Sequence, residues 1–306
     1  MATSLVSLLV ALGFVVCWSS GFIGGRLAAE AALPPMALFA WRFASAALLT
    51  AAWWRIAGTR SAPRRDLLIE AGIGSLTMGG YLLGVMLAIE AGVGTSVTAL
   101  ITALQPLLAA CLASRLLKER SGGLRWLGMA IASAGVALCV ADDFNAQGGA
   151  ALWAYGLPLL SVVSVTLGSV LAARYPTALA MDATLTAQLA AATGVFAVAA
   201  LIEGHGRVPL PALDTSTLAA IGWLVFFSSL GGYGFFVACL RRFGVNLTST
   251  LIYLTPPVTM VWAAAMFGDT PGTLGILGML LASAGVGVAL MGAVTRSPVA
   301  GSRRAC

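Results

Sequence analysis

Two stretches of the chain repeat each other closely. Residues 122–136 read GGLRWLGMAIASAGV and residues 272–286 read GTLGILGMLLASAGV, so ten of fifteen positions are identical at an offset of 150. Two further matches follow in the same order: Gly79-Gly80-Tyr81 with Gly231-Gly232-Tyr233, and Pro106 with Pro256. Apolar helices resemble one another by chance, and each match alone is weak. The collinear series predicts a duplicated chain.

The composition of the chain indicates whether it lies in water or in a membrane. It has 306 residues, of which 59% are hydrophobic and 9% charged, and its mean hydropathy is +0.96. A soluble domain carries roughly 25% charged residues. This composition excludes a soluble enzyme, a nucleic-acid-binding domain, a disordered chain and a disulfide scaffold. The lipid bilayer is the expected environment, and nucleic acid is not an expected partner.

The apolar residues are grouped in runs long enough to cross a membrane as helices. A membrane-spanning helix needs about 20 mainly apolar residues. Ten runs qualify: 5–27, 36–57, 67–90, 93–116, 124–141, 152–173, 182–202, 216–239, 246–267 and 271–293. The sequence therefore predicts an all-α membrane protein with ten transmembrane helices.

The repeat divides these ten spans into two sets of five. The expected domains are 1–145 and 146–293, followed by a tail at 294–306. Because five is odd, the second copy must enter the membrane upside down. Such an inverted repeat is typical of secondary transporters, in which the substrate site lies near the midplane between the copies.

The basic residues predict the orientation. With a cytoplasmic N-terminus, 14 of the 17 basic residues fall on the cytoplasmic side, whereas the outer side receives only Arg26 and Arg207. Arg42 lies inside the second span. This distribution follows the positive-inside rule and places both termini in the cytoplasm.

The chain lacks the residues that several kinds of catalytic, metal and cofactor site require. The chain has one lysine, Lys118, and one histidine, His205, and its five cysteines show no paired spacing. We therefore expect no catalytic residues, no metal site and no cofactor. A structural bundle and a channel are the remaining alternatives, but a single chain with two inverted halves fits alternating access better.

Polar and aromatic residues at membrane depth are the candidates for substrate binding. Tyrosine buried in a bilayer needs a hydrogen-bonding partner, and Thr98, Thr102 and Gln105 form one polar stripe at i, i+4, i+7. Met78 lies at i−3 from Tyr81, and Ser249 and Tyr253 form an i, i+4 pair. The expected substrate-binding residues are Trp18, Met78, Tyr81, Thr98, Thr102, Gln105, Tyr233, Ser249 and Tyr253.

Arg42 has two interpretations. An arginine inside a span is costly and usually faces a cavity or a partner. It is either a structural clamp or an anchor for a substrate carboxylate, and the structural role is favoured.

Prolines and glycines indicate where helices can bend and where they can pack closely. Pro106, Pro256 and Pro257 free backbone carbonyls at matching places in both halves, so we expect hinges there. The fifth and tenth spans contain small residues and almost no polar side chains, which indicates scaffold packing.

Several motifs, in this order, resemble the EamA family of the drug/metabolite transporter superfamily. They are Trp18-Ser19-Ser20-Gly21-Phe22, Trp41-Arg42-Phe43, Leu104-Gln105-Pro106-Leu107, Glu119-Arg120 and the two Leu-Gly-Met helices. The chain looks closest to the bacterial aromatic amino-acid exporters of that family. The resemblance implies a central cavity lined by spans 1, 3, 4, 6, 8 and 9, with spans 5 and 10 as support.

Together these observations predict an exporter in the bacterial inner membrane and not an enzyme. The expected substrates are neutral and aromatic amino acids, moved by alternating access. All carboxylates lie at or beyond span ends, so we expect no obligatory ion coupling. The alternative is a proton-coupled exporter of drugs or cations. A monomer is expected.

Overall fold

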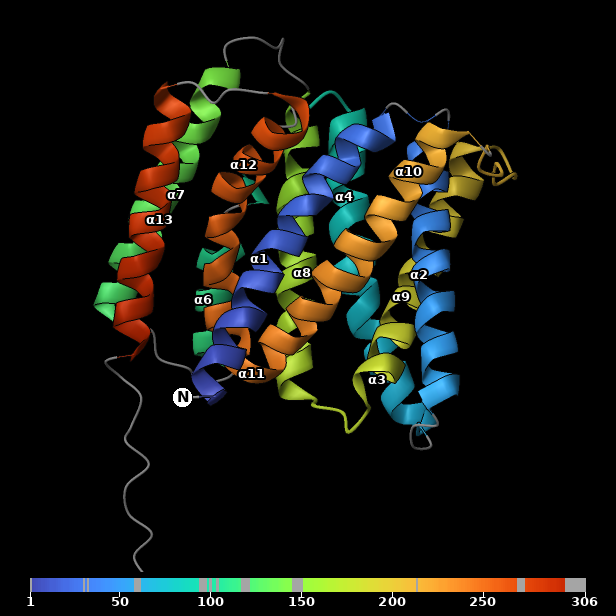
Figure 1. Cartoon of the computed structure of the whole chain (residues 1–306), viewed down its shortest axis with the longest axis horizontal. Coiled ribbons are helices and arrows are strands. Elements are labelled where there is room, and N and C mark those ends of the chain that lie inside the picture. Colours follow the sequence, from blue (N-terminus) through green and yellow to red (C-terminus); the bar gives the residue numbers. More distant parts are fainter. Residues whose placement is uncertain are drawn as a thin grey trace, which may run out of the picture.

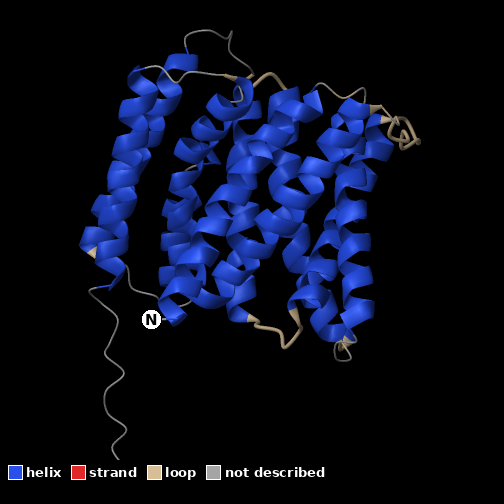
Figure 2. Ribbon diagram, viewed as in Figure 1, coloured by secondary structure: helices blue, strands red, loops and turns tan. Residues whose placement is uncertain are grey.

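The computed structural model describes residues 2–29, 31, 33–57, 62–93, 98, 101–102, 105–116, 122–144, 151–212, 214–268 and 273–294. Within these ranges the secondary structure is helical throughout, with no strand (Figure 2). The long helices run side by side as a bundle, with α7 and α13 at one flank (Figure 1). An all-helical chain is the solution that satisfies backbone hydrogen bonds in lipid without a closed barrel.

The first half contains α1 (Ala2–Ala29), α2 (Pro35–Ala57), α3 (Arg64–Gly74), η1 (Ser75–Gly80), α4 (Tyr81–Glu90), α6 (Gln105–Leu116) and α7 (Gly123–Phe144). The second half contains η2 (Leu152–Tyr155), α8 (Gly156–Arg174), α9 (Met181–Glu203), α10 (Thr215–Trp223), η3 (Leu224–Tyr233), α11 (Gly234–Leu251), η4 (Ile252–Leu254), α12 (Thr255–Phe267) and α13 (Thr273–Val294).

Six described helical stretches are long and apolar enough to cross a membrane by length and composition. They are Leu5–Gly25, Pro35–Ala57, Arg64–Glu90, Leu152–Arg174, Met181–Glu203 and Thr215–Leu254. Helices α6, α7, α12 and α13 occupy the other four runs that the sequence predicts. The tail after Val294 lies outside the described residues.

Gly244 separates two of the predicted spans. Its φ of 76° and ψ of 176° break the helical geometry inside α11. The chain descends from α10 to α11 and returns through α12 (Figure 1). A positive φ of this size costs an L side chain energy, and glycine adopts it without strain. One glycine thus divides the 40-residue apolar stretch Thr215–Leu254.

Two π-helical segments interrupt α-helices at equivalent positions of the two halves. The η1 segment (Ser75–Gly80) is followed directly by Tyr81, and the η3 segment (Leu224–Tyr233) ends on the equivalent tyrosine. A π-turn closes i→i+5 hydrogen bonds and often marks a functional site. The predicted Gly-Gly-Tyr repeat therefore coincides with a repeated backbone feature.

Helices α7 and α13 pack backbone against backbone through the repeated stretch. A Cβ at Gly285 would lie 2.4 Å from the backbone nitrogen of Ala132, and a Cβ at Gly135 would lie 2.4 Å from that of Ala282. The contact is reciprocal, because each copy of the motif meets the other in the same way. This agrees with the scaffold role expected for these two helices.

The main hydrophobic core lies on the other side of the bundle, where α2 packs on α9 and α1 packs on η3. Phe43 and Phe196 stack with ring centroids 5.6 Å apart, and Phe14 and Phe236 are 5.8 Å apart. All four side chains are almost fully buried. This packed aromatic layer borders the cavity described next.

Candidate functional site

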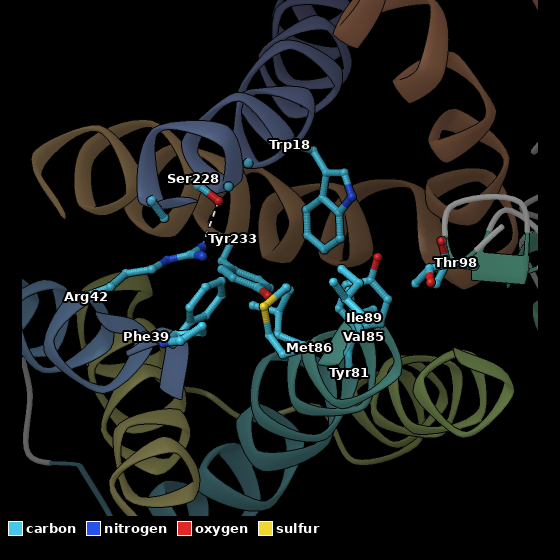
Figure 3. A pocket seen from close by; sticks show the side chains of 16 residues that line it. Trp18, Phe39, Arg42, Tyr81, Val85, Met86, Ile89, Thr98, Ser228 and Tyr233 are labelled. Atoms are coloured by element: carbon cyan, nitrogen blue, oxygen red, sulfur yellow. Dashed lines mark hydrogen bonds between the residues drawn. The ribbon is translucent and has the colours of Figure 1, made fainter. Parts of the chain in front are cut away.

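A cavity of about 480 Å³ lies in the half of the bundle away from the N-terminus. It lies among the C-terminal half of α1, the N-terminal half of α2, α4, the residues Thr98 and Thr102, and η3 (Figure 3). Its wall consists of Trp18, Gly21, Gly25, Ala28, Pro35, Phe39, Arg42, Tyr81, Leu82, Val85, Met86, Ile89, Thr98, Thr102, Ser228 and Tyr233. Its volume is within the usual range for small-molecule pockets, and most of its wall is apolar.

Arg42 is the cationic group of this wall. Only 2% of its surface is exposed. Its Nη2 donates to Ser228 Oγ at 2.7 Å, and its Nε donates to Ser229 Oγ at 2.8 Å. The guanidinium carbon also lies 5.1 Å from the Phe39 ring centroid and 4.8 Å from that of Phe43. Arg42 thus links α2 to η3 and contributes a buried positive charge to the cavity.

Three aromatic side chains from different helices form the floor of the cavity. Trp18 stacks with Tyr81 at a centroid distance of 6.2 Å and meets Tyr233 edge-on at 5.2 Å. Toward the N-terminal end of α1, Trp18 packs on Phe14 at 5.3 Å and on Phe236 at 5.1 Å. The aromatic packing thus continues from the cavity toward that end of the bundle.

Thr98 lies on the side of the cavity opposite Arg42 (Figure 3). Tyr81 forms a side-chain hydrogen bond with Thr102. The Thr98 hydroxyl is buried and has no hydrogen-bond partner among the described residues. A ligand with a second polar group could reach it, because a buried hydroxyl without a partner is costly.

The structure brings together six of the predicted site residues on this wall: Trp18, Arg42, Tyr81, Thr98, Thr102 and Tyr233. Two other predicted residues form hydrogen bonds away from this wall. Ser249 donates to the Val245 carbonyl at 2.7 Å, and the Tyr253 hydroxyl bonds with Ser133 of α7 at 2.7 Å. Their roles in binding stay predictions.

Met78 and Gln105 also lie off the wall. Met78 is fully buried in the main core. Its i−3 spacing to Tyr81 assumes α-helical geometry, but it lies in the π segment, where each turn holds more residues. Gln105 is 2% exposed, and its Nε2 has no hydrogen-bond partner among the described residues.

The roles of the predicted hinges stay predictions. Pro256 is the second residue of α12, directly after the 3-10 segment η4. Pro106 lies in α6 after two residues that are outside the described ranges and Gln105. Pro257 is buried, and the side chain of Pro256 lies outside the described residues.

Several wall residues were not predicted from the sequence, notably Phe39, Met86 and Ser228. Phe39 lies one helical turn before Arg42, a spacing that could have indicated it. Met86 and Ser228 carry no such signal, because an apolar or small residue in an apolar helix does not show which side of the helix faces a cavity.

One carboxylate lies deeper than expected. Glu70 is about two turns into the helix that begins at Arg64, and it is 5% exposed. Gln188 Nε2 donates to it at 2.7 Å, and Thr177 donates a second hydrogen bond. Glu70 is absent from the described cavity wall.

Comparisons with known proteins show which transporters the chain is similar to. Residues 5–141 match the model of the EamA-like transporter family. The chain is 29% identical to the uncharacterized inner membrane transporter YedA of Escherichia coli, over 83% of this chain and 81% of that protein. It is 25% identical to a "Probable amino-acid metabolite efflux pump" of Salmonella typhimurium, over 92% of this chain and 94% of that protein.

A solved crystal structure shows the same fold. It matches 95% of this chain and 99% of its own length with a TM-score of 0.78, at 19% identity. The likeness to this structure extends over both halves of the chain. The family match over residues 5–141, these relatives and the apolar helices together show a multi-pass membrane transporter that is similar to the EamA-like transporter family, and not an enzyme.

Proposed function

We propose that this protein exports small metabolites across the bacterial inner membrane, with neutral and aromatic amino acids as leading substrates. The observation that carries this proposal is the cavity, which places the Arg42 guanidinium and the Ser228 hydroxyl beside the aromatic rings of Trp18 and Tyr233. An amphipathic carboxylate matches both features. The relatives described as an inner membrane transporter and an amino-acid efflux pump support it.

The proposed architecture is ten transmembrane helices in two inverted repeats, 1–145 and 146–293, with both termini and the tail 294–306 in the cytoplasm. The reciprocal packing of α7 on α13 and the two matched π segments support a two-fold relation between the halves. In this orientation the cavity lies in the outer half of the bundle, and Trp18 packs on Phe14 and Phe236 toward the cytoplasmic side.

Transport is proposed to be by alternating access in a monomer, without obligatory ion coupling. The described cavity wall contains no carboxylate that could relay a proton. Both hydrogen bonds to Glu70 come from neutral donors, which suits a structural group. The predicted alternative, an exporter of cations, is disfavoured because Arg42 would repel a cation in the cavity.

The test is release from proteoliposomes that are loaded with a mixed amino-acid pool, at zero membrane potential and equal pH on both sides. We expect selective release of neutral and aromatic amino acids, and loss of this selectivity in Tyr81→Ala. Tyr175→Ala, at an exposed tyrosine after α8, is the matched control. Release that requires a proton gradient would contradict the uncoupled mechanism, and the absence of any amino-acid release would contradict the substrate class.

A further inference from the structure

The cavity has a formal charge that no wall residue balances. Arg42 is the single charged residue among the described residues that line it. Among the wall-forming elements α1, α2, α4 and η3, the one acidic residue is Glu90 at the end of α4, which follows wall residue Ile89 and is not itself on the described wall. The described wall is therefore a mostly apolar surface with one formal positive charge and no carboxylate of its own.

The guanidinium keeps part of its hydrogen-bonding capacity for a ligand. It has five N–H groups, of which two are used by the hydroxyls of Ser228 and Ser229. The Ser228 hydroxyl accepts one of these bonds, so its own proton is available to donate. A carboxylate fits such a set of donors, because the planar guanidinium can bind both carboxylate oxygens.

The ammonium group of an amino acid finds no equivalent partner. The faces of Trp18 and Tyr81 offer a cation–π contact, which is much weaker than pairing with a carboxylate in a buried site. A zwitterion would also bring a second positive charge into the cavity that already holds Arg42. A ligand with a carboxylate and no ammonium leaves the occupied cavity neutral, which lowers the cost of burial.

We propose that the preferred substrate is a monoanionic amphipathic carboxylate, whose amino group is missing or acylated, and that the zwitterionic parent amino acid binds the same site more weakly. Arg42 and Ser228 bind the carboxylate, and the aromatic floor and Met86 contact the apolar part. This inference rests on the proposed export function and moves the preferred substrate from the zwitterionic amino acid to its deaminated or N-acylated derivative.

The charge of the substrate has a consequence for energetics. Over a complete cycle the protein returns to its starting state, so the net charge moved is that of the substrate. A cytoplasm that is negative inside drives an anion outward, and about 100 mV changes its equilibrium distribution about 50-fold. An exporter of monoanions can thus accumulate substrate outside the cell without a coupling ion.

Binding to the purified protein in detergent, measured by calorimetry, tests the charge preference with a matched set of ligands. N-acetylphenylalanine has only the carboxylate, phenylalanine amide only the ammonium, phenylalanine both and N-acetylphenylalanine amide neither. 3-Phenylpropanoate, which is smaller than phenylalanine, controls for the bulk of the acetyl group. We expect both monoanions to bind at least about tenfold more tightly than phenylalanine, and both amides to bind weakly or not at all.

Transport in proteoliposomes with a clamped potassium diffusion potential tests the charge movement. Efflux of N-acetylphenylalanine should rise when the interior is made negative, whereas phenylalanine efflux should not respond. In Arg42→Gln the advantage of N-acetylphenylalanine over its amide should disappear, while Arg174→Gln, at an exposed arginine of α8, should keep it. The wild-type ligand series and the potential dependence decide the question even where a variant fails to fold.

The outcomes separate this inference from the proposed function. If phenylalanine is transported and binds as tightly as both monoanions, the inference is overturned and the export of amino acids stands. If N-acetylphenylalanine efflux ignores the membrane potential, the inference is overturned as well. If no ligand of the set is bound or transported, both proposals fail.

Discussion

The packing of α7 on α13 gives a prediction whose size follows from the structure. Ordinary contact needs about 3.4 Å, and an alanine Cβ at position 285 would lie 2.4 Å from the backbone nitrogen of Ala132. The two helix backbones must separate locally by about 1 Å in Gly285→Ala. Overpacking of this kind costs roughly 1–3 kcal/mol, whereas the higher helix propensity of alanine returns up to about 1 kcal/mol.

Gly287→Ala is the matched control on the same helix. A Cβ at Gly287 meets no atom within 4 Å, and the first copy of the repeat already has Ala137 at the equivalent position. This variant receives the gain in helix propensity without the clash. The difference between the two variants therefore isolates the packing cost, which we expect to be roughly 1–3 kcal/mol.

The assay is the loss of the monodisperse peak in size-exclusion chromatography after heating in mild detergent. Gly285→Ala should lose this peak at a lower temperature than Gly287→Ala, and Gly135→Ala should behave like Gly285→Ala because the contact is reciprocal. Equal melting of Gly285→Ala and Gly287→Ala would refute the close approach of the two backbones. Unequal effects of the two buried glycines would refute the two-fold packing.

Three further predictions concern single polar contacts. Ser228→Ala removes the acceptor of the 2.7 Å hydrogen bond from Arg42, and hydrogen bonds to charged groups contribute about 1.5–3 kcal/mol, so thermal stability in detergent should fall. Glu70→Gln should export at the wild-type rate between pH 6 and pH 8, as should the control Asp66→Asn; a folded Glu70→Gln protein without transport would argue for ion coupling. Hydrogen bonds lower the pKa of Asp214 to about 2, so its stabilising contribution is present above the ordinary carboxyl pKa of about 4 and is lost as the pH falls toward 2. The melting temperature of Asp214→Ala should therefore lie below that of the wild type at pH 7, and the two should converge near pH 2.

Most of the helices could be predicted because lipid imposes a strong constraint on sequence. A spanning helix must be apolar over its whole length, and charges collect at its ends. The break near residue 244 was visible as a polar interval, although the sequence alone does not say that Gly244 makes the turn with a positive φ. The repeated glycines of 122–136 and 272–286 likewise indicated close helix packing, although the sequence does not say which helix each one contacts.

The cavity was predicted less completely, for a geometric reason. Polar and aromatic residues stand out in an apolar helix, so Arg42, Tyr81 and Tyr233 were found from sequence. Apolar wall residues such as Met86 do not stand out, and the π segment changed the side on which Met78 lies. Helical periodicity fails where the hydrogen-bonding pattern itself changes.

The order of residues was enough to predict a membrane environment, the helical class and the internal repeat, because hydropathy, charge placement and internal similarity can be read along the chain. Which residues share the cavity depends on how the helices pack. Arg42 and Ser228 are 186 residues apart, and their hydrogen bond exists because η3 packs against α2. The net charge of the cavity follows from that packing, because several helices together form the wall. The sequence of one helix does not show which other helix packs against it.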